Sequence, residues 1–206
     1  MSVLVHRAGV GAIGVGMGRH PEGTRARSTA ADDYFPLPTG PATPQRGIRA
    51  PAEGLASRER HERAAPWWLG THGGAGETTL AGAVAGSAAA GHAWPVPPDP
   101  SRPQDVVLVA RTHLTGLRAT QLAATQWASG SVPGVTLVGL VLLADAPGRL
   151  PRALHELADL VSGGVPRVWH LPWVEAWRLG DEPRPVPREL TRLIHDLDSL
   201  LPGRGV

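Results

Sequence analysis

The sequence contains no cysteine, no lysine and no asparagine, and it has a single tyrosine and a single phenylalanine. The absence of cysteine excludes disulfides, thiolate metal sites and cysteine nucleophiles. With arginine as the only strong base, almost nothing titrates at alkaline pH. The isoelectric point therefore reaches 10.3 at a net charge of only +2. Such a balance gives no strong signal for a nucleic-acid interface, which needs a basic stripe on a folded surface.

Long apolar runs are also missing. The apolar stretch at residues 8–17 is interrupted by glycines. It is also shorter than the roughly 20 residues that cross a bilayer. We therefore predict no membrane span and a cytoplasmic location. For residues 1–30, a secretory signal peptide and a wrongly assigned start codon stay open as alternatives.

Glycine and proline are abundant, with 26 and 21 residues in a chain of 206. Residues 1–65 show no sustained helical or strand period. We predict that they form a disordered tail, because they bury too little apolar area to offset the entropy of ordering. Within this tail, residues 34–38 are either a docking motif in polyproline conformation or an inert linker. Residues 66–201 form the predicted domain.

Strands and helices alternate after residue 66. A continuous apolar run predicts a buried strand at residues 106–110, and largely apolar segments predict strands at residues 66–70 and 135–143. Residues 167–171 are predicted to form a short strand that ends at Pro172. Helices are predicted from Glu77, after Thr112, from Leu150 and from Pro187, and residues 91–102 are a proline-rich break. The second helix is predicted to turn Leu114, Leu117, Leu122 and Trp127 inward. This alternation predicts an α/β fold with a mostly parallel sheet and helices on both of its faces.

One segment carries a chemical motif, Gly70-Thr-His-Gly-Gly-Ala-Gly-Glu-Thr-Thr79. It lies between a predicted strand and a helix start. Glycines there let backbone N–H groups point at an anion, and the helix N-terminus adds partial positive charge. The candidate phosphate-binding residues are His72, Gly73, Gly74, Ala75, Gly76, Glu77, Thr78 and Thr79. If Mg²⁺ is bound, Thr78 is the candidate metal ligand.

The residues from His72 to Thr79 resemble the deviant Walker A loop of the ParA/MinD family, K-G-G-x-G-K-T-T, at the glycine and threonine positions. Residues 138–142 resemble the family's strand that normally ends in a base-contacting asparagine. Residues 169–173 resemble the strand that ends in a proline near the base. Asp145 and Pro172 are therefore the candidate base-side residues. The resemblance covers about residues 66–201 and implies a reduced P-loop NTPase-like three-layer sandwich. The chain is also similar to actinobacterial proteins of unknown function with a WWLGxHGGAG loop.

The chain departs from the family pattern at three features. His72 and Glu77 replace the two family lysines, the family's aspartate-containing strand has no clear counterpart, and the asparagine is missing. A glutamate in place of the lysine would repel a phosphate instead of attracting it. The repulsion is about 4 kcal/mol at a separation of about 4 Å and an effective dielectric constant of about 20. We therefore assign no catalytic residue and no certain cofactor, and ATP with Mg²⁺ is the candidate ligand.

The resemblance implies a non-catalytic, P-loop-derived interaction protein with weak or no nucleotide binding. It would have protein partners, with a homodimer as one arrangement. The implied context is plasmid or mobile-element partition or DNA-transfer machinery. The alternative is an unusual ATPase of the ParA/MinD type in which an arginine replaces the P-loop lysine.

Other polar pairs and aromatic residues have simpler interpretations. His72 either stands in solvent or pairs with Glu77. His155 with Asp159, and His195 with Asp198, stand at helical spacing and are interpreted as surface pairs rather than metal ligands, because no third ligand is near in sequence. Trp67 and Trp68 are interpreted as core packing rather than as a stacking platform.

Overall fold

The computed structural model describes residues 37–201. The apolar stretch at residues 8–17 and residues 34–36 of the predicted docking motif lie outside the described residues. Between residues 37 and 201, no helix combines the length and the apolar character needed to cross a membrane.

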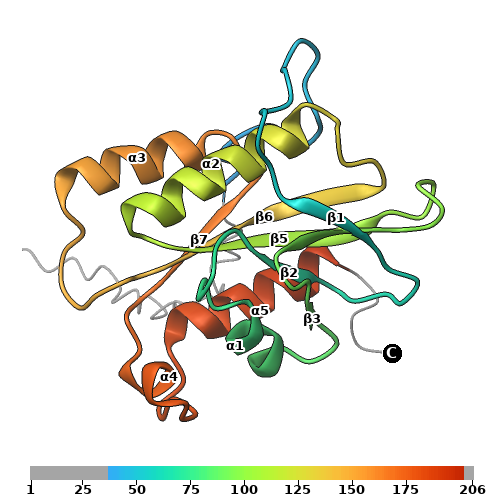
Figure 1. Cartoon of the computed structure of the whole chain (residues 1–206). Helices are drawn as coiled ribbons and strands as arrows, with labels where there is room; N and C mark the ends of the chain where they lie inside the picture. The colour runs from blue at the N-terminus through green and yellow to red at the C-terminus, as the bar shows by residue number, and fades with distance from the viewer. Residues whose placement is uncertain (1–36, 202–206) are drawn as a thin grey trace, which may run out of the picture. The chain divides into compact units, whose positions relative to one another are not determined.

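Five parallel strands form the central sheet in the order β3-β2-β5-β6-β7 (Figure 1). They are β2 Trp67–Gly70, β3 Ala88–Ala89, β5 Gln104–Arg111, β6 Val135–Leu143 and β7 Val168–Leu171. Residues 106–110 of β5 and residues 137–143 of β6 are buried without interruption. Strands that are covered on both faces need such continuous apolar runs, and this is why the sequence identified them.

Helices cover both faces of this sheet (Figure 1). α2 Leu114–Ala128 and α3 Arg152–Ser162 lie on one face, and α1 Glu77–Ala83 and α5 Arg188–Leu200 lie on the other. The adjacent tryptophans of β2 point to opposite faces of the sheet. Trp67 belongs to the apolar cluster beneath α2, and Trp68 belongs to the cluster beneath α5. The predicted α/β class with a mostly parallel sheet is confirmed.

The segment 37–65 packs on the domain, which corrects the predicted disordered tail for these residues. β1 Ala56–Glu59 pairs in parallel with β4 Ala93–Val96 and forms a second, two-stranded sheet. Closer to the N-terminus, the Thr39 hydroxyl donates to the Val165 carbonyl at 2.9 Å. These contacts are made with residues distant in sequence, so no local period reveals them. The domain therefore begins before the boundary predicted at residue 66.

Two further predictions need correction. The break predicted at residues 91–102 contains β4, whose Trp94 is fully buried. On α2, Leu117 and Trp127 are buried as predicted, but Leu114 and Leu122 are 45% and 43% exposed. Thr120, Ala123 and Ala124 line the inner side of this helix instead. Short α4 Glu175–Leu179, which follows β7, was not predicted.

One side chain, Gln126 of α2, joins the early segment to the domain. Its Oε1 accepts from the Leu55 N–H and from the Trp94 indole, both at 2.9 Å, and its Nε2 donates to the Leu55 carbonyl at 2.9 Å. We predict that Gln126→Ala lowers the free energy of unfolding by about 1–3 kcal/mol, because the indole N–H of the buried Trp94 loses its acceptor. Urea unfolding measures the change.

Gln121→Ala is the matched control, because Gln121 is an exposed residue of the same helix. A surface substitution of this kind stays within about 0.5 kcal/mol of the wild type. Equal losses in the two variants would contradict the role given to Gln126.

Candidate functional site

The glycine-rich loop leaves the carboxyl end of β2 and leads into α1. This edge of a parallel sheet is where α/β proteins place ligand contacts. Gly76 has φ 104°, and a Cβ there would lie 3.2 Å from Leu143 Cδ2. Glycine is therefore required at this position for backbone conformation and for packing. Ala75, another candidate, is buried.

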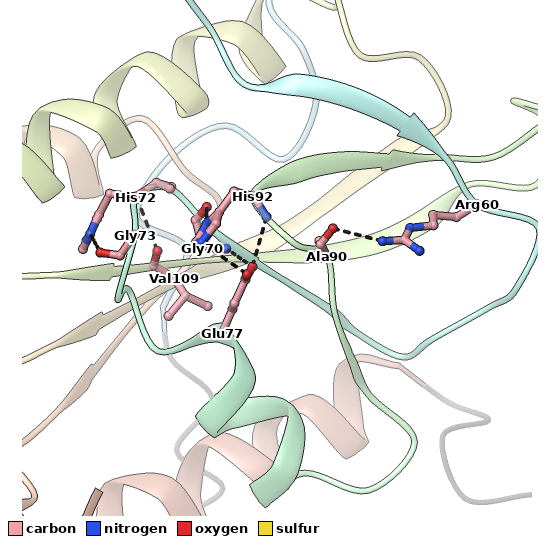
Figure 2. Close-up of polar contacts among 9 residues, drawn as sticks. Arg60, Gly70, His72, Gly73, Glu77, Ala90, His92 and Val109 are labelled. Atoms are coloured by element: carbon pink, nitrogen blue, oxygen red, sulfur yellow. Dashed lines mark hydrogen bonds and ion pairs between the residues drawn. The ribbon is translucent and has the colours of Figure 1, made fainter. Parts of the chain in front are cut away.

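Glu77 turns its side chain inward beneath the loop. The residue is only 6% exposed, and its Oε2 accepts from the Gly70 backbone N–H at 2.8 Å (Figure 2). The His92 backbone nitrogen lies 3.5 Å from the same oxygen. The loop thus holds a carboxylate of its own at the strand end.

His92, which the sequence did not identify, is the histidine beside this carboxylate (Figure 2). Its Nδ1 lies 2.9 Å from the Gly70 carbonyl, which can only accept, so Nδ1 is assigned the proton. Its Nε2 lies 3.6 Å from Glu77 Oε1, and protonation of Nε2 makes this an ion pair. The backbone of His92 has φ 55°, which is uncommon for a residue with a side chain. We call Gly70, Glu77 and His92 the Glu77 latch.

His72 lies on the other side of the loop and does not pair with Glu77 (Figure 2). Its Nε2 accepts from the Arg111 backbone N–H at 3.1 Å, and its Nδ1 lies 2.9 Å from the Gly73 carbonyl. These contacts need a neutral ring with the proton on Nδ1. Burial lowers the pKa of His72 below its usual value, which favours that neutral form.

Arg111, at the end of β5, also holds the loop, and the sequence did not single it out. Its Nε donates to the Gly74 carbonyl at 3.0 Å, and its Nη1 donates to the Ala144 carbonyl at 3.3 Å. One guanidinium therefore links the loop to the segment that follows β6. The parallel order of β2, β5 and β6 brings these three chain segments to the same edge.

The remaining predicted site residues fall into two separate cavities. Thr78 and Thr79 line a cavity of about 580 Å³ between α1, α4 and α5. Pro172 lines another, of about 340 Å³, with Thr112, Ala144 and His170 at the carboxyl ends of β6 and β7. The Asp145 N–H donates to the Thr112 hydroxyl at 3.2 Å and lies beside this second cavity. Thr78 and Thr79 therefore line a different cavity from Pro172.

Other predicted pairs behave as surface or core features. His155 Nδ1 lies 2.9 Å from Asp159 Oδ2 in an exposed pair, as predicted. His195 Nδ1 also lies 3.9 Å from Oδ1 of its neighbour Asp196, which is buried. Trp67 and Trp68 are buried, which confirms their core role. Within residues 37–201, no three histidine, aspartate or glutamate side chains are grouped to hold a metal ion.

A family model, described as a family of unknown function (DUF6668), matches residues 64–194. The chain belongs to this family. The matched part of the DUF6668 chain contains the loop, the Glu77 latch and Arg111. No match was found among curated proteins or among solved structures.

A substitution at Gly116 of α2 tests how closely His72 and Arg111 pack against this helix in the DUF6668 chain. A Cβ on Gly116 would lie 2.6 Å from the Arg111 carbonyl oxygen and 2.7 Å from His72 Nε2. We predict that Gly116→Ala lowers the free energy of unfolding by about 1–3 kcal/mol, because the backbone and His72 must shift. Chemical unfolding measures the loss.

Gly82→Ala is the matched control, since a Cβ on Gly82 of α1 meets nothing within 4 Å. Alanine should stabilise that helix by about 0.5–1 kcal/mol. A Gly116→Ala protein as stable as Gly82→Ala would refute the close packing of His72 on α2.

Proposed function

We propose that this DUF6668 domain is a non-catalytic interaction module derived from a P-loop NTPase of the ParA/MinD type. The observation that carries the proposal is the buried Glu77 carboxylate, which accepts from Gly70 N–H at 2.8 Å. A phosphate group near this loop would meet a negative charge where a P-loop supplies a lysine. The strand–loop–helix order at β2 and α1, and the helices on both faces of the sheet, support a P-loop-like three-layer sandwich as the ancestral form.

Phosphoryl transfer needs a cation at the phosphates and groups that hold Mg²⁺. The chain has no lysine for the first task. For the second, β3 and β4 are the strands that lie between α1 and β5 in the chain, and neither strand contains an acidic residue. Thr78, the candidate metal ligand, is exposed and lines the cavity beside α4. These features support weak or no nucleotide binding and no hydrolysis.

The interaction role is supported by apolar side chains on the outer helices. Leu114 and Leu122 of α2 and Leu160 of α3 are exposed, the last by 63%. Exposed apolar groups of this size are available to a protein partner or to a second copy of the chain. The proposed context is plasmid or mobile-element partition, or DNA transfer, in the cytoplasm. The resemblance of the loop to the ParA/MinD family supports this context.

Arg111 favours one alternative, an unusual ATPase of the ParA/MinD type. Its guanidinium lies 3.0 Å from the Gly74 carbonyl and places a permanent positive charge at the loop. In that function Arg111 would supply the charge of the missing lysine. Its contacts with Gly74 and Ala144 show it bound to carbonyl oxygens, which supports a structural role in the leading proposal.

Isothermal titration with ATP–Mg²⁺, together with a phosphate-release assay, tests the proposal. We expect no low-micromolar binding and only background hydrolysis, because Glu77 repels phosphates. Glu77→Gln removes the charge and keeps an oxygen that accepts from Gly70. If the loop retains a phosphate-binding shape, this variant should bind ATP about tenfold or more tightly, a change of about 1.4 kcal/mol.

Gly76→Val is the control that disrupts the loop, since Gly76 has φ 104°. Hydrolysis by the wild type that disappears in Gly76→Val and in Arg111→Gln would refute the non-catalytic proposal and establish the ATPase alternative. A folded Glu77→Gln protein that gains no affinity would show that the loop has lost its phosphate-binding geometry.

A further inference from the structure

A cavity of about 280 Å³ lies at the amino end of β5, where Gln104 forms part of its wall. The glycine-rich loop lies beyond the carboxyl ends of the strands. At 3.3 Å per residue, the length of β5 separates the two edges by roughly 23 Å. The wall of the cavity includes Arg60, His61, Arg63, Asp99 and Arg102. This cavity is distinct from the loop and from the two cavities near it.

Arg60 is held in place from several directions. Its Nη2 donates to the Ala90 carbonyl at 3.2 Å (Figure 2), and its guanidinium lies 5.1 Å from the centre of a Trp67 ring. Its Nη1 contacts Glu62 at 3.2 Å. The buried Nε of Arg60 has no hydrogen-bond partner within the described part of the chain. A guanidinium fixed in this way loses little conformational entropy when it binds a ligand.

The buried side chain of Gln104 fixes the segment that carries these arginines. Its Nε2 donates to the carbonyls of Arg60, at 3.4 Å, and Glu62, at 3.0 Å. Its Oε1 accepts from the Trp67 indole at 3.1 Å. Arg63 Nη2 in turn donates to the Pro103 carbonyl at 3.2 Å. Core contacts therefore fix the backbone at Arg60 and Glu62 on one side of the cavity, whereas the lining residues His61, Arg63, Asp99 and Arg102 are exposed.

The charges at the cavity favour an anion. The lining residues include three arginines and one acidic residue, Asp99. Asp99 accepts from Ser101, which lowers the pKa of Asp99 and leaves Arg102 as its charged neighbour. Glu62, whose side chain is 59% exposed, contacts Arg60, and burial raises the pKa of the half-buried Asp105, which lies near Arg63. Arginines therefore outnumber acidic residues among the lining residues, and each arginine also has one acidic neighbour.

We propose that this cavity binds a tetrahedral oxyanion, either free phosphate or sulfate or the phosphoryl group of a small molecule. The planar donors of arginine match such oxygens in pairs. A volume of about 280 Å³ suits a compact ligand, near the lower limit for small-molecule sites. The site does not include the glycine-rich loop. The proposal for this cavity can therefore fail while the proposed function holds, and the reverse is also possible.

Titration calorimetry of the full chain with inorganic phosphate and with sulfate, at constant ionic strength set by chloride, tests this site. We expect saturable binding by the wild type. Arg63→Gln and Arg102→Gln should each weaken it about tenfold, because each removes a charged donor. Arg152→Gln is the control, because Arg152 is an exposed arginine that is also paired with an acid, Glu156. A second arm with glycerol phosphate distinguishes a phosphoryl group carried by a small molecule from a free anion.

No saturable binding to any of the three probes would overturn the proposal. Undiminished binding in a folded Arg63→Gln/Arg102→Gln double variant would also overturn it. Binding that the double variant keeps and that Gly76→Val abolishes would assign the anion to the glycine-rich loop instead. Melting curves of all variants establish that lost binding does not reflect lost folding.

Discussion

The hydrogen bond from Gly70 N–H to the buried Glu77 carboxylate is the interaction on which the conformation of the loop depends. Charge-assisted hydrogen bonds of this kind contribute about 1.5–3 kcal/mol, and a buried carboxylate without donors would be costly. The inward direction of Glu77 also explains the position of His92, which approaches the carboxylate with its ring and its backbone nitrogen. The loop therefore encloses a carboxylate of its own between the end of β2 and the start of α1.

The opposite flank of the loop is fixed by β5 and its surroundings. The Arg111 backbone donates to His72, and the Arg111 side chain donates to Gly74. Gly116 permits this arrangement because α2 has no side chain at the point where His72 approaches. Two separate sets of contacts thus hold the loop, one through Glu77 and one through Arg111. A loop held in this way is suited to a structural role, which supports the proposed interaction module.

The sequence allowed the central sheet to be predicted, but not what packs around it. Residues 135–143 form β6 with the predicted bounds, because a strand covered on both faces requires a continuous apolar run. β1 is exposed along its length and has no apolar pattern, and Pro95 lies within β4. The loop itself was identified from its glycines. The partners of Glu77 and His72 could not be, because His92 and Arg111 reach them only through the order of the strands.

Amide hydrogen exchange at Gly70, followed by NMR, measures the central contact most directly. The account predicts a protected Gly70 amide in the wild type and in Glu77→Gln. In Glu77→Ala this amide should exchange at least about tenfold faster, a change of about 1.4 kcal/mol. The Thr71 amide, which donates to the Val109 carbonyl, should stay protected and serves as the internal reference. A Gly70 amide that is unprotected in the wild type, or that exchanges equally slowly in Glu77→Ala, would contradict the account.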